Sequence, residues 1–352
     1  MTIARKIGLS VSVLRADNGD AIRITVHSVS GYKNILIDGG EPSTYMLRNK
    51  KRKKEPRALK ALIDELRLKR QRIDLLIMTH VDDDHIGGIL RWFETDPQAD
   101  LIVERVWFNS GSLIRKLFPS HEEIYKTSIG QGVKFEDYIQ EKGIWEKTIF
   151  LAGNDRSLFG LTFQILSPTK KNLDALLKKW KRERPESLTS SAMNDYGVSL
   201  KTHIQSDSFH EDIAVHNGSS IAFIIKLGEK NLLFLGDSHP SVIVESLSRL
   251  GYSKENKLKC ELVKLSHHGS KSNTSRELLQ MIKCRRFLIS TNGVRHSHPD
   301  KQLIARLVSC FHRCDLYFNY PELIESIISE QDRKDFPGLR TLEMPRKISI
   351  RL

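Results

Sequence analysis

Apolar positions recur along the chain at the spacings typical of strands and of amphipathic helices. Residues 9–26 alternate apolar and polar positions on both sides of an Asn-Gly-Asp turn, which predicts a β-hairpin. Residues 55–71 carry apolar side chains at 59, 62, 63 and 66, the spacing of one helical face. The same reasoning predicts buried strands at NILIDGG (34–40) and IDLLIMTH (73–80), a polar loop at 79–88, and a helix opening at GGILRWFE (87–94).

The rest of the chain continues with strand-like runs and few helical ones. Further strands are expected at LIVERVWFN (101–109), LTFQILSP (161–168), SSIAFIIKL (219–227), NLLFLGD (231–237), LKCELVKLSHHGS (258–270) and CRRFLISTNGV (284–294), and a helix at HPDKQLIARLVSCFH (298–312). The intervening residues 169–216 are highly polar and look inserted, with a helix at 171–184 and a loop at 185–197. We therefore expect an α/β fold in a single domain, 1–352, with a polar, basic insertion at about 169–216.

The loop behind the strand at 73–80 gathers acidic and imidazole groups. His80, Asp82 and Asp84 alternate, and His85 follows directly. Carboxylates packed this closely repel one another unless a cation neutralises them, so the loop is a compact candidate for metal ligation. The alternative interpretation is an acidic loop whose aspartates cap a helix.

Three further strand ends deliver the same residue types. One strand ends at Asp237, a second at His267 and His268, and a third in a turn that carries His296 and His298. Packing alone does not explain His or Asp at four strand ends. The pattern favours a metal site built from several strand ends.

Composition and charge indicate which class of partner the chain could bind. The formal net charge is +13 and the pI is near 9.5. Two clusters, RNKKRKKEPRALK (48–60) and KKWKRER (178–184), hold many of the basic residues, which are either solvated loops or sites that attract a polyanion. The expected nucleic-acid contacts are Lys51, Arg52, Lys53, Lys54, Lys178, Lys179, Lys181 and Arg182.

No apolar run is long enough to span a membrane, and the N-terminus lacks the pattern of a signal peptide, so a cytoplasmic protein with no membrane partner is expected. The four cysteines fit a reducing compartment as free thiols. Cys310 and Cys314, with His312 between them, could instead be half a zinc site, although no second cysteine pair stands at a typical spacing.

The ordered motifs resemble the metallo-β-lactamase fold, in the branch of metallo-hydrolases attached to the competence DNA-uptake channel ComEC. The resemblance rests on ADNGDAIRI, ILIDGG, THVDDDHIGG, NGSSIAFIIKLGEKNLLFLGD, LVKLSHHGSKSNTS and ISTNGVRHSHP, which cover nearly the whole chain in order. It implies an αββα sandwich with two divalent metal ions at one edge between the sheets.

The resemblance also implies roles for single residues. His80 and Asp82 would hold the first metal, Asp84 and His85 the second, and Asp237 would bridge the two. His268 would be the late histidine ligand, with His267 and Ser270 as additional groups. His298 would bind the scissile group or protonate the leaving group, and Asp84 and His298 are the predicted catalytic residues.

Two departures from the family pattern stand out. Asp82 replaces the usual second histidine of the metal loop, and no mid-chain histidine ligand is evident. His203, His210 or His216 could supply that ligand, or all three could be surface residues. The resulting oxygen-rich set suits manganese, and zinc remains open.

The function expected from these features is metal-dependent hydrolysis of phosphodiester bonds in nucleic acid by a metal-bound hydroxide. Two alternatives stay open. One is a hydrolase of cyclic nucleotides or another small substrate. The other is a catalytically weak nucleic-acid-binding subunit of a multi-protein bacterial system.

Overall fold

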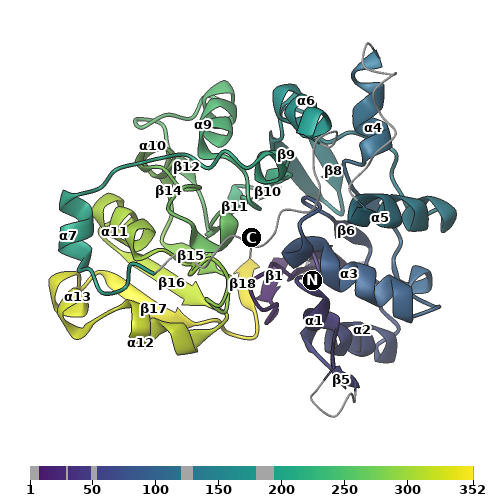
Figure 1. Cartoon of the computed structure of the whole chain (residues 1–352), viewed down its shortest axis with the longest axis horizontal. Coiled ribbons are helices and arrows are strands. Elements are labelled where there is room, and N and C mark those ends of the chain that lie inside the picture. The colour runs from purple at the N-terminus through teal and green to yellow at the C-terminus, as the bar shows by residue number, and fades with distance from the viewer. Residues whose placement is uncertain (1–7, 29–30, 49–53, 120–129, 180–193, 352) are drawn as a thin grey trace, which may run out of the picture. The chain divides into compact units, whose positions relative to one another are not determined.

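In a computed structural model, the chain divides into two compact units (Figure 1). The structure describes residues 8–28, 31–48, 54–119, 130–179 and 194–351. The first unit comprises Met1–Phe150, Lys170–Glu186 and Pro345–Leu352, and the second comprises Leu151–Thr169 and Ser187–Met344. The expected insertion thus contributes to both units. A single domain over the whole chain stays a prediction.

The first unit is built on a six-stranded sheet in the order β18-β1-β2-β3-β6-β7. The hairpin and its two neighbours pair antiparallel, whereas β3, β6 and β7 run parallel. Its strands are β1 (Gly8–Val13), β2 (Ile22–Ser28), β3 (Gly31–Ile37), β6 (Leu75–Ile77), β7 (Val106–Trp107) and β18 (Ile348–Arg351), with a separate β4 (Met46–Arg48) and β5 (Lys54–Pro56) pair. Its helices are α1 (Pro42–Tyr45), α2 (Ala58–Leu68), α3 (Asp83–Thr95), α4 (Gly111–Lys116), α5 (Gly130–Glu141) and α6 (Lys170–Lys179).

Periodicity predicted this unit well where burial is regular. The hairpin pairs over its full length, and α2 buries the four side chains expected from the spacing, Leu59, Leu62, Ile63 and Leu66. The strand expected at 101–109 is wrong in extent, because residues Asp100–Ile102 form a 3-10 turn, Val103 makes an isolated bridge with Ile73, and the strand β7 covers Val106–Trp107.

Helix α3 begins at Asp83, earlier than the expected opening at 87–94. Asp82 takes the N-cap position in extended backbone, and Asp83 and Asp84 occupy the first turn. Negative side chains are favourable there because the unpaired N–H groups of a helix start carry partial positive charge. Asp84 and His85 therefore sit on a helix rather than in a loop.

The second unit holds an eight-stranded sheet in the order β17-β16-β15-β13-β11-β10-β9-β8. The five strands from β11 to β17 run parallel, and the other pairs are antiparallel. The strands are β8 (Arg156–Leu158), β9 (Leu161–Ser167), β10 (Ala222–Leu227), β11 (Lys230–Phe234), β13 (Leu262–Lys264), β15 (Arg286–Ile289), β16 (Cys314–Phe318) and β17 (Leu339–Glu343), with a separate β12 (Leu258–Lys259) and β14 (Ile282–Lys283) pair. The helices are α7 (Leu200–Gln205), α8 (Val215–Gly218), α9 (Pro240–Arg249), α10 (Arg276–Gln280), α11 (Lys301–Cys310), α12 (Ile324–Ile327) and α13 (Glu330–Asp335).

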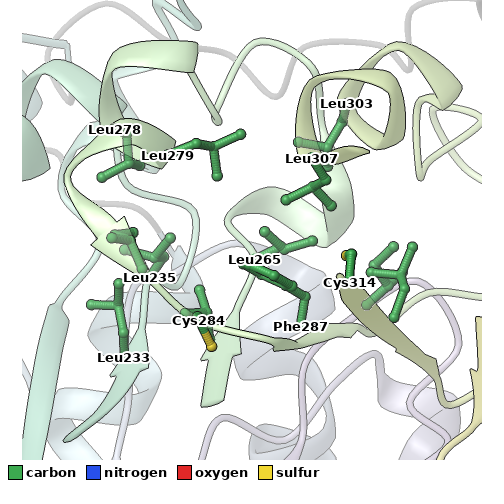
Figure 2. Close-up of a cluster of buried hydrophobic side chains, with 14 of the residues drawn as sticks. Leu233, Leu235, Leu265, Leu278, Leu279, Cys284, Phe287, Leu303, Leu307 and Cys314 are labelled. Atoms are coloured by element: carbon green, nitrogen blue, oxygen red, sulfur yellow. The ribbon is translucent and has the colours of Figure 1, made fainter. Parts of the chain in front are cut away.

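A core of buried aliphatic side chains lies between this sheet and its helices. Figure 2 shows Leu278 and Leu279 from α10 and Leu303 and Leu307 from α11 above strand residues such as Phe287. The first unit has its own cluster, formed by residues between 36 and 145. Each unit therefore buries a separate core, and the expected α/β class is confirmed.

The cysteines are free thiols, as expected. Cys284 and Cys314 lie in the core of the second unit (Figure 2). Burial raises the pKa of Cys284 to about 12, which keeps its thiol protonated at neutral pH. Within the described ranges, no group of potential metal ligands includes a cysteine, so Cys310 and Cys314 behave as packing residues.

In the parts of the chain that the structure describes, no helix combines the length and the apolar composition that a membrane crossing requires.

The described end of the polar segment 194–216 is tightly joined to α11. Asp195 accepts the backbone N–H groups of Lys301 and Gln302 at 2.8 and 3.0 Å. Lys301 forms a buried ion pair of 2.8 Å with Asp332 of α13, which also accepts the N–H of Leu200. Burial opposes ionisation of Asp332, but these hydrogen bonds outweigh it and lower the pKa of the carboxyl below its usual range.

We expect Asp332→Ala to destabilise the folded protein by about 3–5 kcal/mol, because it leaves the Lys301 ammonium buried without its partner. Urea unfolding at neutral pH measures the loss. The depressed pKa stabilises the fold above the unfolded carboxyl pKa of about 3.9, so the difference from wild type should shrink as the pH falls through the lower, folded value.

Asp335→Ala is the matched control on the same helix. Asp335 pairs at 2.9 Å with Lys201, whose side chain is 61% exposed, so its loss should cost less than about 1 kcal/mol. Equal losses from the two substitutions would contradict the importance of the buried pair.

Candidate metal centre

A buried carboxylate organises the strand ends of the first unit. Asp38 follows β3, is fully buried, and has a left-handed backbone with φ of 55°, which aspartate tolerates better than most residues. Its carboxylate accepts the backbone N–H and the hydroxyl of Thr79 at 2.8 and 2.7 Å. It also accepts Nδ1 of His85 at 2.8 Å. One side chain thus connects the end of β3 to the loop after β6.

These hydrogen bonds determine which ring nitrogen of each histidine carries the proton. A carboxylate only accepts, so His85 donates from Nδ1 and keeps a lone pair on Nε2. The Thr79 hydroxyl proton is used on Asp38, so its oxygen accepts Nδ1–H of His80 at 3.0 Å. Both imidazoles therefore present Nε2 as a ligand atom, and a carboxylate behind a histidine is the usual support of a metal ligand.

The four residues predicted in the metal loop lie together. His80 and His85 are buried, with their ring centroids 4.2 Å apart. Nε2 of His80 is 3.6 Å from a carboxylate oxygen of Asp82, and Nε2 of His85 is 4.0 Å from one of Asp84. The carboxylates approach the nitrogen that holds the lone pair in each ring.

The donor set of this unit fits a divalent cation. One ligand atom each from Asp20, Asp38 and His85 lies within 4.8 Å of the others, and all three residues are buried. Because both oxygens of Asp38 already accept hydrogen bonds, Asp38 acts as the support of His85, and His80, Asp82, Asp84 and His85 are the candidate ligands. Carboxylate and imidazole ligands are those that manganese and zinc accept.

Parallel strand ends provide the candidate residues of the second unit. Asp237 lies just beyond β11, and His268 lies just beyond the adjacent β13; both are nearly fully buried. His268 donates Nδ1–H to the carbonyl oxygen of Ser290 at 3.0 Å, so its Nε2 again holds the lone pair. That nitrogen is 3.8 Å from Oδ2 of Asp237.

His298 lies beside this pair in the same unit. Its ring centroid is 5.0 Å from that of His267, and its Nδ1 is 3.2 Å from Oδ2 of Asp300. Burial lowers the pKa of His298, and the hydrogen bond with Asp300 opposes the shift. Ser270, two residues after His268, is buried, and its hydroxyl oxygen accepts the backbone N–H of Ser272 at 3.2 Å.

The structure therefore groups the predicted ligands into two sets, one in each unit. His80, Asp82, Asp84 and His85 belong to the first, and Asp237, His267, His268 and His298 to the second. That the sets share two metal ions stays a prediction.

The three mid-chain histidines have different surroundings. His203 is buried on α7, where its ring bonds the backbone carbonyl of Asp195 at 3.2 Å, which is a packing role. His210 is exposed, and His216 lies on α8. A mid-chain ligand stays a prediction.

The predicted nucleic-acid contacts lie mostly beyond the described structure. Lys178 is exposed on α6 and pairs with Asp174 at 2.5 Å. Lys51, Arg52, Lys53, Lys181 and Arg182 lie outside the described residues, as do the side chains of Lys54 and Lys179.

Sequence reasoning missed the residues behind the ligands. Asp38 carried a usable signal, since it ends an apolar strand just before Gly-Gly, as Asp237 ends another just after Gly236. Asp300 also carried one, two residues after His298. Asp212 carried none, because it lies 61 residues from Asn273, through which it acts on His267.

Comparisons with known proteins identify similar sequences. Residues 21–163 match the model of the Metallo-beta-lactamase superfamily. The chain is 22% identical over 301 residues to ComE operon protein 3 of Bacillus subtilis (strain 168), covering 84% of this chain and 30% of that protein. It thus spans about 30% of that relative's length. These matches confirm the family that the motifs resemble and support its ComEC-type branch.

Solved structures include similar chains at low identity. Zn(2+)-bound PqqB from Methylobacterium extorquens is 12% identical with a TM-score of 0.45, covering 97% of this chain and 100% of that one. A diphosphatase from the PhnP family is 12% identical with a TM-score of 0.41, covering 98% of each chain.

We expect Asp38→Asn to weaken metal binding by about 10- to 100-fold, the usual loss when the support of a ligand histidine is removed. The amide cannot accept all three donors, so the proton positions on His80 and His85 are no longer determined. Chelator competition with zinc or manganese on the folded variant measures the affinity.

Asp74→Asn is the matched control in the same unit. Asp74 is a buried carboxylate just before β6. It accepts the backbone N–H of Asn34 at 2.8 Å and the ammonium of Lys33 at 2.6 Å. Because β3 and β6 run parallel and Asp38 follows β3, Asp74 lies at the other end of this strand pair. It should lower stability and leave metal affinity at the wild-type value. Wild-type affinity in Asp38→Asn would refute the supporting role of Asp38.

Proposed function

The chain contains a metallo-β-lactamase superfamily domain, and on this premise we propose that it is a metal-dependent nuclease that hydrolyses phosphodiester bonds of nucleic acid. Membership of this superfamily supports a metal-dependent hydrolase. The structural observation that carries the proposal is the set of three imidazoles, His80, His85 and His268, each held with its Nε2 lone pair near a carboxylate.

Different residues of the chain would hold the metal ions and contact the substrate. Nε2 of His80 and His85, with Asp82 and Asp84, would hold cations at the first unit, and Asp237 with His268 would hold them at the second. When bound, divalent cations supply Lewis acidity to the scissile phosphate. His298 would bind the scissile group or deliver a proton to the leaving oxygen.

Charge favours nucleic acid over a small neutral substrate. A net charge of +13 attracts a polyanion, and binding that neutralises phosphates releases counterions. The ComEC-type branch that the sequence resembles is attached to a DNA-uptake channel, which points the same way. Protein partners in a multi-protein bacterial system belong to this proposal as well.

The two alternatives make different predictions. A hydrolase of cyclic nucleotides or another small substrate would cleave with little dependence on salt, because it meets few phosphates. A catalytically weak binding subunit would bind nucleic acid with the same affinity whether or not Asp84 is present.

We expect Asp84→Ala to lose cleavage of single- and double-stranded DNA and of RNA by at least about 100-fold in manganese or zinc, since it removes a carboxylate beside Nε2 of His85. Gel assays on purified protein measure the rates. The affinity for nucleic acid should fall steeply with added salt.

Asp83→Ala is the control from the adjacent position. Its carboxylate accepts Gln131 of α5 at 2.7 Å and so points away from the histidines. Cleavage should stay at the wild-type rate. If no nucleic acid is cleaved by metal-loaded wild-type protein while a small ester, lactam or cyclic nucleotide is, the nuclease proposal fails.

We also expect purified protein to hold two equivalents of divalent metal by elemental analysis, and Asp237→Ala to hold fewer, because it would lose the carboxylate beside Nε2 of His268. A metal content of zero after reconstitution with zinc and with manganese would contradict the proposal. The folded state of the variant is verified by its thermal transition.

A further inference from the structure

The second unit contains a partly buried polar network around His267 that the predicted ligand roles do not explain. Nδ1 of His267 lies 3.0 Å from Oδ1 of Asn273. The Asn273 amide nitrogen donates to Oδ2 of Asp212 at 2.9 Å and to the backbone carbonyl oxygen of Asp237 at 3.1 Å. Asn273 is fully buried, so its amide has a single set of partners.

The acceptors around Asn273 determine how its amide is oriented. A carboxylate and a carbonyl oxygen only accept, so the NH₂ group of Asn273 must face Asp212 and Asp237. Its oxygen therefore faces His267. An amide oxygen only accepts as well, so Nδ1 of His267 must carry the proton.

The amide of Asn217 would favour an unprotonated Nδ1 on His267, but its contact with this nitrogen is longer than that of Asn273. The amide nitrogen of Asn217 lies 3.5 Å from Nδ1 of His267, but it donates to Oδ2 of Asp212 at 2.6 Å. One of the two Asn217 amide hydrogens bonds this carboxylate, and the other reaches Nδ1 of His267 only at 3.5 Å, the upper limit of a hydrogen bond. Oδ2 of Asp212 also lies 3.9 Å from Nδ1 of His267, and its negative charge favours a proton there.

The proton on Nδ1 leaves the other ring nitrogen, Nε2, unprotonated. With Nδ1 protonated, Nε2 of His267 holds the lone pair, and it lies 3.9 Å from Oδ2 of Asp237. His268 approaches the same oxygen with its own Nε2 at 3.8 Å. These separations are too long for hydrogen bonds and close to the roughly 3.4 Å between two ligand atoms that share an ion at bond lengths near 2.1 Å.

We infer that Asp212 is a positioning residue which, through Asn273, holds His267 as the Nδ1–H tautomer and makes His267 a metal ligand rather than a proton donor. The inference rests on the proposed metal-dependent function and adds a ligand to it. It also assigns a role to the end of the polar segment 169–216, because Asp212 lies on it.

The anchoring of this segment makes the role physically reasonable. Arg306 of α11 is buried and donates to Asp207 and to the carbonyl oxygens of Ser208 and Thr274. One guanidinium therefore holds both the stretch that carries Asp212 and the loop that carries Asn273.

The test reads the tautomer in metal-free protein. Two-bond ¹H–¹⁵N correlation spectra of ¹⁵N-histidine-labelled protein at about pH 9, where an imidazole of ordinary pKa is neutral, show which nitrogen of His267 is protonated. We expect Nδ1–H in wild type. In Asp212→Ala and in Asn273→Ala we expect a mixture of tautomers and zinc affinity about 10- to 100-fold weaker in chelator competition.

Asp195→Ala is the matched control on the same segment. The side chains of Asp195 and Asp212 are 16% and 13% exposed, but Asp195 bonds the start of α11 and not His267. It should lower thermal stability and leave tautomer and zinc affinity unchanged. If Asp212→Ala does not fold, Asn273→Ala provides the same readout.

Two results would overturn the inference. One is an Nε2–H tautomer of His267 in wild-type protein. The other is wild-type tautomer and zinc affinity in both Asp212→Ala and Asn273→Ala. Neither depends on cleavage, so the loss of the proposed nuclease activity and the failure of this relay are distinguishable.

Discussion

The candidate centre depends on buried carboxylates that can only accept hydrogen bonds. Asp38 is fully buried and satisfied by three donors, two of them from Thr79 and one from His85. Burying a charge without such partners would cost several kcal/mol, about the magnitude of a whole domain's margin of stability. Because the donors are required by the fold, the protons on the histidines are determined by the fold too.

The spacing of apolar residues predicted helices and strands, because regular burial depends on residues that are close together in the sequence. The hairpin at 9–26 and the helix at 58–68 are examples. The start of α3 was misplaced because Asp83 and Asp84 read as loop residues, whereas a helix start stabilises them electrostatically. The strand at 101–109 was predicted too long because the apolar residues before Val106–Trp107 include a 3-10 helix.

The proximity of the candidate ligands to one another was predictable from the sequence, whereas the positions of their supporting residues were not. His80, Asp82, Asp84 and His85 lie within six positions, so their proximity is local. The partner of His85 is 47 residues away, and Asn273 is 61 residues from Asp212. Spacing along the chain carries no information on contacts at such separations, which only the folded sheets bring together.

The acidic centre and the basic chain impose opposite demands on a polyanionic substrate. The net charge of +13 attracts phosphates over roughly the Debye length of 8–10 Å. Close to Asp82 and Asp84, however, a phosphate meets carboxylates and is repelled. Under the proposed function, cations held there would remove this repulsion before they contribute to any chemistry. Productive approach of nucleic acid would then require the metal ions, whereas long-range attraction would depend only on the basic side chains.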